Sequence, residues 1–255
     1  MTPGTIDFPG GALEVVEIAG DRSLPSLVLM HGGLGSAQLW DDFTPKLAAA
    51  TGSRTVAFSR HGHGWSARPP KPRTPRFMHE EAREVTPELL SRLELEDPIL
   101  VGHSDGASIA LIYAAHRPAQ AVVAMAPHVF VEEVGLREIA RARDAFLHGG
   151  LRERMARRHR DPDAAFYGWN DVWLDPAFAD WDIRGLVSSI ACPLLVIQGR
   201  DDQYGTMAQI DAIEAAARVP VTRVELDCRH APQLERPRET LEAIAGFVGG
   251  LEVRR

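Results

Sequence analysis

Short apolar runs alternate with helical segments along most of the chain, and this alternation limits the fold more than any other feature of the sequence. The runs with the length and composition of buried strands lie at 24–32, 55–60, 98–101, 121–127, 193–199 and 221–227. Apolar residues at helical spacing fill the segments at 37–51, 87–96, 107–117, 207–219 and 238–250. Strands and helices that alternate in this way form a mostly parallel sheet covered on both faces. The alternation therefore predicts an α/β fold with a doubly wound, mostly parallel sheet, and the run at 13–19 adds an antiparallel or edge strand.

One long interval, residues 128–190, interrupts this alternation of strands and helices. It holds no strand-like run, only helical and irregular sequence rich in arginine and aromatic residues. Because predicted core strands flank it on both sides, we predict a helical lid inserted into one domain rather than a separate domain. The α/β core then consists of residues 1–127 and 191–255. The segment at 67–77 carries four prolines and is predicted to be a surface loop.

Composition and charge narrow the class of protein. The 255 residues are 45% hydrophobic and 25% charged, as in ordinary globular proteins. The formal net charge of −7 argues against nucleic-acid or acidic-membrane partners, because binding phosphates needs a concentrated basic face. Two cysteines, Cys192 and Cys228, cannot build a disulfide framework, although a single bridge between them stays open as the alternative to a reducing cytoplasm. Neither a signal-peptide pattern nor a membrane-length apolar run is visible. We therefore expect a cytoplasmic protein.

The pentapeptide Gly-His-Ser-Asp-Gly at 102–106 lies between a predicted strand and a predicted helix. The pattern G-x-S-x-G is common by chance, but in this position it is typical of a sharp turn that presents its serine above the sheet. Gly102 and Gly106 omit side chains that would collide with neighbouring elements, and the following helix directs N–H groups at developing negative charge. The pattern thus predicts Ser104 as a nucleophile. The alternative is a polar turn without chemical function.

A serine nucleophile needs a base, and the base needs an acid that orients it. Asp202 follows the predicted strand at 193–199, and His230 follows the predicted strand at 221–227. The order Ser104, Asp202, His230 is the one expected when successive strand ends assemble a triad. Taken singly, Asp202 could cap a helix and His230 could be a structural histidine. Their joint occurrence at separate strand ends favours the triad.

The segment after the first predicted parallel strand offers a binding site for an oxyanion. Its sequence His-Gly-Gly-Leu-Gly, which starts at His31, contains glycines that let backbone N–H groups turn toward a cavity. We predict the N–H of Gly33 as one donor, with Leu34 as the next choice, and the N–H of Asp105 as the other. Removing one such donor typically costs about 2.7–4 kcal/mol of transition-state stabilisation.

Five motifs together resemble those of α/β-hydrolase-fold proteins, in particular the lid-bearing group of small esterases, lactonases and carbon–carbon bond hydrolases. They span nearly the whole chain and are HGG (31–33), SRHGHGWSARP (59–69), GHSDG (102–106), GRDD (199–202) and CRHAPQLERP (228–237). The resemblance implies the α/β-hydrolase fold, and it places the acid at the fourth position of G-x-x-D, which selects Asp202 over Asp201. A serine at position 104 disfavours the epoxide and haloalkane hydrolases of this fold, whose nucleophile is aspartate.

The triad and the resemblance together imply a serine hydrolase of the carboxylesterase type. Such an enzyme would cleave a small carboxylic ester, with an aromatic or short acyl group, through an acyl-enzyme intermediate. Its partner would be a small-molecule ester or a related acyl compound, and a homodimer stays open. Three alternatives remain: hydrolysis of a carbon–carbon bond in a ring-cleavage product, hydrolysis of a lactone or thioester, and ligand binding without catalysis.

Aromatic residues crowd the predicted lid. Such clusters usually form a lid's own core, but a lid over a hydrolase site also supplies the apolar walls of the pocket. We predict Phe166, Trp169 and Trp173 as substrate contacts from the lid. Four further residues are predicted to lie at the pocket, namely Leu34, His103, His128 and Phe130.

Two motifs near residue 62 suggest cofactors but lack the context that such sites need. His61 and His63 offer two metal ligands, yet no neighbouring acidic residue completes a hydrolytic metal site. The run GHGWSA formally fits a dinucleotide-binding pattern, but a proline-rich loop follows where that pattern requires a helix. We therefore expect neither a metal nor an organic cofactor.

Overall fold

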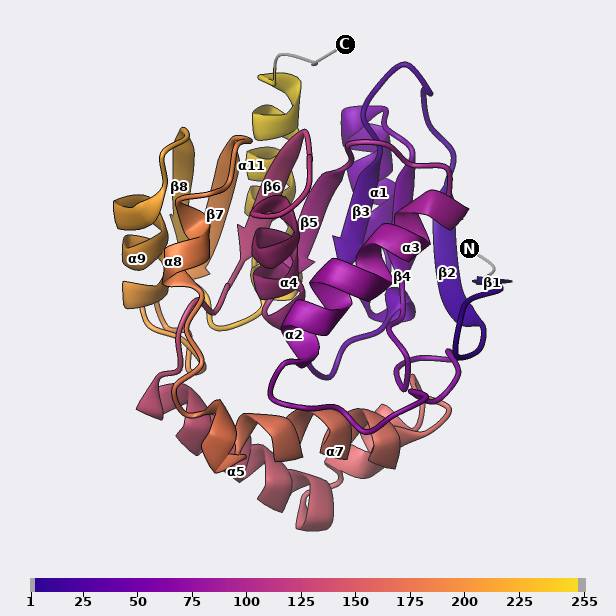
Figure 1. The fold of residues 1–255 in the computed structure, drawn as a ribbon, viewed down its shortest axis with the longest axis vertical. Helices are drawn as coiled ribbons and strands as arrows, with labels where there is room; N and C mark the ends of the chain where they lie inside the picture. The colour runs from indigo at the N-terminus through magenta and orange to yellow at the C-terminus, as the bar shows by residue number, and fades with distance from the viewer. Residues whose placement is uncertain (1–2, 252–255) are drawn as a thin grey trace.

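Within residues 3–251, which the computed structural model describes, eight strands form one sheet at the centre of the molecule (Figure 1). The strands are β1 (Gly4–Ile6), β2 (Leu13–Ile18), β3 (Leu27–Met30), β4 (Thr55–Phe58), β5 (Ile99–His103), β6 (Ala121–Met125), β7 (Leu194–Gly199) and β8 (Val221–Leu226). Their order across the sheet is β1-β2-β4-β3-β5-β6-β7-β8, with β2 antiparallel to β1 and β4 and the other neighbours parallel. The predicted α/β fold with a mostly parallel sheet is confirmed.

The chain reverses its direction of winding next to β3. From β3 it crosses to β4 on one side, and from β4 it returns past β3 to β5 on the other side. At such a switch point the connections after the two strands diverge and leave a crevice at the strand carboxyl ends. The loop after β3 and the turn after β5 therefore meet at the position where a binding site is expected.

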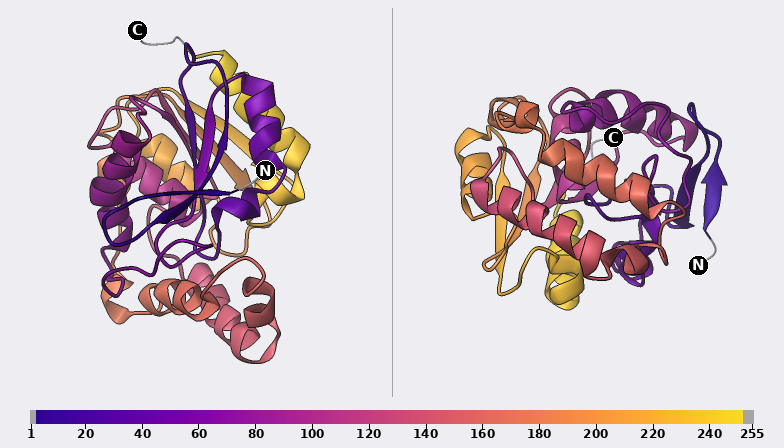
Figure 2. Two further views of the ribbon diagram at one scale, coloured as in Figure 1. Left: turned by 90° about the vertical axis from the view of Figure 1, so that its right-hand side faces the viewer. Right: turned by 90° about the horizontal axis from the view of Figure 1, so that it is seen from below.

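Helices cover both faces of the sheet (Figure 2, left). The core helices are η1 (Ala37–Trp40), α1 (Phe43–Thr51), α2 (Phe77–Glu80), η2 (Glu81–Val85), α3 (Thr86–Arg92), α4 (Asp105–Ala114), α9 (Ala208–Ala216), α10 (Pro232–Glu235) and α11 (Pro237–Gly249). Alternate residues of β3 serve the two faces, because Leu27 and Leu29 pack with α1 and α11, whereas Val28 and Met30 pack with α4. Burial on both faces explains why this strand is a continuous apolar run in the sequence.

Two predicted helices differ from the structure. The predicted helix at 37–51 is divided into η1 and α1 at Asp41, whose φ of 46° lies in the left-handed region and ends the first turn. The predicted helix at 87–96 begins earlier and ends earlier, since α2, η2 and α3 follow one another from Phe77 to Arg92. No helix within residues 3–251 combines the length and the apolar character needed to span a membrane.

The interval 128–190 folds into helices, most of which lie across the carboxyl ends of the strands (Figure 1, bottom). They are α5 (Glu133–His148), α6 (Leu151–Met155), α7 (Pro162–Trp173), η3 (Pro176–Phe178) and α8 (Arg184–Val187). Helices α5 and α7 run side by side (Figure 2, right), and Phe146 of α5 stacks on Phe166 of α7 with ring centroids 3.9 Å apart. The predicted helical content of this interval agrees with the structure, and its action as a lid stays a prediction.

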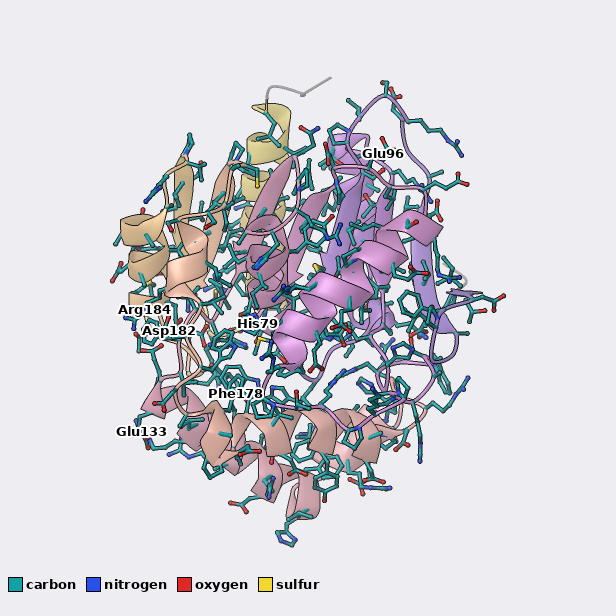
Figure 3. The ribbon with its side chains drawn as sticks, viewed as in Figure 1. His79, Glu96, Glu133, Phe178, Asp182 and Arg184 are labelled. Carbon is teal, nitrogen blue, oxygen red and sulfur yellow. The ribbon has the colours of Figure 1, made fainter. Side chains whose placement is uncertain are left out.

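The insertion rejoins the core through a short polar junction (Figure 3). Asp182 accepts hydrogen bonds from the backbone N–H and from Nε of Arg184, each at 2.8 Å. The guanidinium of Arg184 lies 4.9 Å from the ring centroid of Phe130, which itself forms an isolated antiparallel bridge with Asp182. The junction thus holds the segment that enters the insertion against the segment that leaves it.

Gly106 lies where α4 packs directly on β3, so no side chain can be accommodated there. A Cβ would lie 2.0 Å from the carbonyl oxygen of Met30 and 2.7 Å from that of His31. We expect Gly106→Ala to lower the free energy of unfolding by about 1–3 kcal/mol or more, because backbone atoms cannot move aside as a side chain can. Urea denaturation followed by circular dichroism measures this change.

Gly246 provides a matched control for this substitution. It also lies inside a helix, α11, but a Cβ there would meet nothing within 4 Å. Gly246→Ala should raise the free energy of unfolding by about 0.5–1 kcal/mol, because glycine is a poor helix former. Effects of the same sign and size at the two positions would contradict the close packing of α4 on β3.

Candidate active site

Ser104 occupies a strained turn between β5 and α4. Its φ of 54° and ψ of −123° lie in a region that residues other than glycine rarely adopt. The turn is tight because a Cβ on Gly102 would lie 2.4 Å from Cα of Ala107. The backbone N–H of Ser104 donates to the carbonyl of Met125 at 2.9 Å, which anchors the turn to β6. The side chain is thereby presented at the carboxyl edge of the sheet.

The three residues predicted as a triad lie within hydrogen-bond distance of one another. His230 Nε2 is 3.0 Å from Ser104 Oγ, and His230 Nδ1 is 2.8 Å from Asp202 Oδ2. The Asp202 carboxylate also accepts from the N–H of Tyr204 and from Nε2 of Gln198, both at 2.8 Å. Burial alone would raise the pKa of Asp202, but the hydrogen bond and charge of His230 outweigh it, so the pKa lies below its ordinary value. Asp202 is therefore ionised at neutral pH and can orient His230.

The loops after β7 and β8 approach each other closely enough to join Asp202 and His230. A Cβ on Gly199, the last residue of β7, would lie 2.1 Å from the carbonyl oxygen of Arg229. Position 199 is therefore restricted to glycine. Without that close approach, the imidazole of His230 would not reach both Asp202 and Ser104.

The two N–H groups predicted to bind an oxyanion are free to do so. Within residues 3–251, neither the N–H of Gly33 nor that of Asp105 donates a hydrogen bond. The loop after β3 lies against the serine, since a Cβ on Gly32 would be 3.1 Å from Ser104 Cβ. A Cβ on Gly33 would lie 2.2 Å from the indole ring of Trp169, so helix α7 covers this glycine. The arrangement can stabilise negative charge that develops beside Ser104.

A cavity of about 230 Å³ adjoins Ser104 between the sheet and the insertion, and apolar surface makes up most of its wall. The structure brings five of the seven predicted substrate contacts to this cavity, namely Leu34, His103, His128, Trp169 and Trp173. Ser104, His230, Gly33 and Asp105 also line it, whereas Asp202 lies behind His230.

Phe130 and Phe166 do not reach the cavity, which corrects two of the predicted contacts. Phe166 is fully buried between α5 and α7, where Phe146 stacks on its ring. Phe130 lies at the junction beneath the guanidinium of Arg184. Phe166 thus packs within the insertion, and Phe130 packs at its junction with the core.

Several cavity residues were not predicted, and they differ in how far the sequence signals them. The six bulkier ones outside the loop at 31–36 are Leu39, Trp40, Ile139, Tyr204, Gln233 and Leu234. Leu39 and Trp40 follow the glycine loop after β3. Tyr204, Gln233 and Leu234 lie within four positions of Asp202 or His230. For these five residues, proximity in the chain to a predicted site residue is a usable signal. Ile139 lies in the middle of α5, where only the docking of that helix decides which side chains face the cavity.

Two further histidines lie beside the triad. His128 Nε2 is 3.5 Å from Ser104 Oγ, and His103 donates from Nε2 to the carbonyl oxygen of His230 at 2.8 Å. Burial first, and then the proximity of His230, lower the pKa of His103 and of His128 to about 3. Both rings are therefore neutral at neutral pH and place no positive charge next to His230.

The side chain of Asp105 connects the turn after β5 to helix α7. Its Oδ1 accepts a hydrogen bond from Nε1 of Trp173 at 3.1 Å, and its Oδ2 has no partner within residues 3–251. Burial raises the pKa of this carboxyl group, against the opposing effects of Arg60 and Arg73. The same residue thus offers its N–H beside Ser104 and its carboxyl group to the insertion.

The histidines considered as metal ligands are used as hydrogen-bond donors to the backbone. His61 Nε2 lies 3.2 Å from the carbonyl oxygen of Gly11, and His63 Nε2 donates to that of Gly33 at 2.8 Å. In the described part of the chain, no three or more His, Cys, Asp or Glu side chains are grouped so as to hold a metal ion. His63 instead supports the loop that carries Gly33.

A model of the alpha/beta hydrolase family matches residues 27–243. Among curated proteins, the serine hydrolase BPHL of Mus musculus is 28% identical to this chain over 195 residues, which are 69% of this chain and 63% of the mouse protein. The chain thus spans less than two thirds of the length of that relative.

Solved structures show the same fold at low sequence identity. The enol-lactonase from Burkholderia xenovorans LB400 has a TM-score of 0.77 at 22% identity, and the match covers 96% of this chain and 100% of the enol-lactonase chain. The esterase EaEST from Exiguobacterium antarcticum has a TM-score of 0.77 at 18% identity, over 98% of this chain and 100% of the other. Both similarities concern the arrangement of the backbone.

The neutral histidines beside the triad should make stability depend on pH. Because the folded-state pKa of His128 is about 3 and the unfolded value is near 6.5, the unfolded chain binds more protons between these values. The free energy of unfolding should therefore fall as the pH falls from 6.5, by about 1.4 kcal/mol per pH unit for each such histidine. Urea denaturation between pH 7.5 and 4.5 measures the slope.

His128→Gln tests the contribution of this single ring. Glutamine cannot be protonated, so the slope of unfolding free energy against pH below pH 6.5 should decrease by about 1.4 kcal/mol per unit. The matched control is His148→Gln, at an exposed position at the end of α5. An unchanged slope in His128→Gln would show that His128 is not held neutral in the folded protein.

Proposed function

The chain belongs to the α/β-hydrolase family, and on that premise we propose that it is a serine hydrolase that cleaves small carboxylic esters. The observation that carries the proposal is the continuous hydrogen-bonded series from Asp202 through His230 to Ser104, with Ser104 facing the cavity. Two unused backbone N–H groups beside the serine support it, because an oxyanion formed there would meet donors that need no rearrangement.

The reaction would proceed through an acyl-enzyme. His230 accepts the proton of Ser104 as Oγ attacks the acyl carbonyl carbon, and Asp202 stabilises the resulting imidazolium. The carbonyl oxygen becomes an oxyanion between the N–H groups of Gly33 and Asp105. Proton transfer from His230 to the alkoxide releases the alcohol. Water activated by His230 then attacks the acyl group, and collapse of the second tetrahedral intermediate returns free Ser104 and the acid.

The cavity favours an uncharged substrate with a short or aromatic acyl or alcohol group. Its volume of about 230 Å³ is small, and the residues that line it include Trp40, Trp169 and Trp173. Burial of hydrocarbon against apolar walls stabilises the bound substrate by about 0.8 kcal/mol per methylene group, whereas a charged group would lose its hydration. Helices α5 and α7 would act as the lid over such a substrate, in keeping with their position across the strand ends.

The partner and location complete the proposal. The substrate would be a small molecule, without nucleic acid, membrane or cofactor as partner, and a homodimer is compatible with it. A reducing cytoplasm is favoured because two cysteines, Cys192 and Cys228, cannot build a disulfide framework.

Ser104→Ala tests the nucleophile. For a series of p-nitrophenyl esters from acetate to decanoate, we expect turnover by the wild-type protein with an optimum at short or medium chain length. The variant should lose at least about 10⁴-fold in kcat, because the acyl-enzyme cannot form. The matched control is Ser189→Ala, at an exposed position after α8, which should keep the wild-type rate.

Labelling with a fluorophosphonate separates the remaining outcomes. If the wild-type protein hydrolyses none of these esters but Ser104 is labelled, the nucleophile is active and the substrate class is wrong. A vinylogous diketone, the substrate of carbon–carbon bond hydrolysis, would then be the next substrate to measure. Absence of both turnover and labelling would contradict the proposal and leave ligand binding without catalysis as the function.

Ile139→Ala tests whether helix α5 limits the acyl chain. Ile139 lines the cavity and is 3% exposed, so its truncation should open space for further methylene groups. The rate on octanoate relative to butyrate should rise about fourfold for each added methylene that is buried, which corresponds to about 0.8 kcal/mol. The matched control is Ile213→Ala in α9, which removes an equally buried side chain away from the cavity. The same change of preference in both variants would refute a role of Ile139 in specificity.

A further inference from the structure

Arg60 is a buried cation that the proposed reaction does not use. It follows β4 and is 1% exposed, and within residues 3–251 no carboxylate lies within 4.0 Å of its guanidinium. Its Nη1 donates to the carbonyl of His31, and its Nη2 donates to that of Gly32 at 3.1 Å. A guanidinium that is shielded from water and has no carboxylate in direct contact is costly to bury, so its hydrogen bonds to the backbone stabilise the folded protein.

The two carbonyl groups that Arg60 contacts belong to the loop beside Ser104. The carbonyl of Gly32 accepts two further hydrogen bonds, from Nδ1 of His31 at 2.7 Å and from the N–H of Gly35 at 3.1 Å. In a trans peptide the N–H points away from the C=O of the same peptide group. Donors gathered on the Gly32 carbonyl therefore direct the N–H of Gly33 to the opposite side, and that N–H donates to nothing within residues 3–251.

The backbone of Arg60 also controls the ring of His31. The N–H of Arg60 donates to Nε2 of His31 at 3.1 Å, so Nε2 is the acceptor and the ring proton resides on Nδ1. That proton is the one donated to the Gly32 carbonyl. Burial lowers the pKa of Arg60 to about 10 and that of His31 well below its ordinary value, so the guanidinium is charged and the imidazole neutral at neutral pH.

We propose that Arg60 is a positioning residue that fixes and polarises the peptide between Gly32 and Gly33, so that the N–H of Gly33 is ready to bind the oxyanion. The proposal rests on the function proposed above. A charged donor on a carbonyl draws electron density from the amide nitrogen and strengthens its N–H as a donor. Arg60 thus acts on the oxyanion through the peptide group and does not touch the substrate.

The test compares Arg60→Met, Arg60→Lys and Arg54→Met with the wild-type protein. Methionine keeps an apolar stem but removes every N–H donor, whereas lysine keeps the charge without the planar fork that spans two carbonyl groups. Arg54 precedes β4 at its opposite end and donates from Nη1 to the carbonyl of Leu93 at 3.0 Å. Arg54→Met therefore removes the same kind of bond at a distance from Ser104.

For p-nitrophenyl butyrate, Arg60→Met should lower kcat by about 10- to 100-fold and leave KM within about threefold, because only the transition state carries the oxyanion. Affinity for an arylboronic acid, which forms a tetrahedral adduct with the serine, should fall by a similar factor. Affinity for the unreactive amide butyranilide should not change. Arg60→Lys should lie between Arg60→Met and the wild-type protein, and Arg54→Met should keep wild-type kinetics.

Wild-type kcat per folded molecule in Arg60→Met, or an equal loss of affinity for the boronic acid and the amide, would overturn the proposal. Circular dichroism gives the folded fraction. If Arg60→Met does not fold, Arg60→Lys decides, and wild-type affinity for the boronic acid in that variant overturns the proposal.

Failure of the proposed function can be distinguished from failure of the proposal about Arg60, because in the first case the wild-type protein would show no turnover. In that case the role of Arg60 is still tested by the chemical shift of the Gly33 amide proton, measured in protein labelled with ¹⁵N-glycine. This shift should change in Arg60→Met and not in Arg54→Met. An unchanged shift in Arg60→Met would overturn the proposal.

Discussion

The tight turn between β5 and α4 is the constraint on which the site depends. It holds Ser104 in a backbone conformation that costs on the order of 1–3 kcal/mol for a residue other than glycine. The conformation persists because its surroundings leave no alternative, since Gly102 lies against Ala107 and Gly106 lies against the carbonyl of Met30. The same contacts set the separation of α4 from β3 and so place the loop after β3 beside the serine. One packing constraint therefore places both the Ser104 hydroxyl at the cavity and the adjacent N–H groups.

The distribution of charge follows from the apolar character of the cavity. An unpaired charge in such surroundings would be costly. His103 and His128 avoid this cost by remaining neutral, and Asp202 avoids it through its hydrogen bonds to His230 and other donors. The positive charge of Arg60 is held on the far side of a peptide group, where carbonyl oxygens satisfy it. Arg60 therefore acts on the site by polarising the peptide between Gly32 and Gly33, and it places no cation in the cavity.

The sequence predicts those features that depend on local pattern and on the order of strands. The parallel sheet follows from the alternation of strands and helices, and the approach of Ser104, Asp202 and His230 follows from their positions after separate strands. Sequence periodicity cannot decide how an amphipathic helix docks. Phe166 and Trp169 lie on neighbouring turns of α7, yet Phe166 packs against α5 and Trp169 lines the cavity. That difference arises from tertiary contacts between helices far apart in the chain.

The insertion and the loop after β3 form one hydrogen-bonded assembly. Successive carbonyl groups of the loop accept from buried donors: Gly32 from Arg60, Gly33 from His63, and Leu34 from Nε2 of His159 at 3.2 Å. His159 lies in the insertion, and its Nδ1 accepts from the N–H of residue 64 at 2.9 Å, which determines which nitrogen carries the proton. A displacement of the insertion must therefore break a bond to the loop that faces Ser104. Access to the cavity and the orientation of its N–H groups are consequently coupled, so substitutions in the insertion should affect kcat as well as substrate preference.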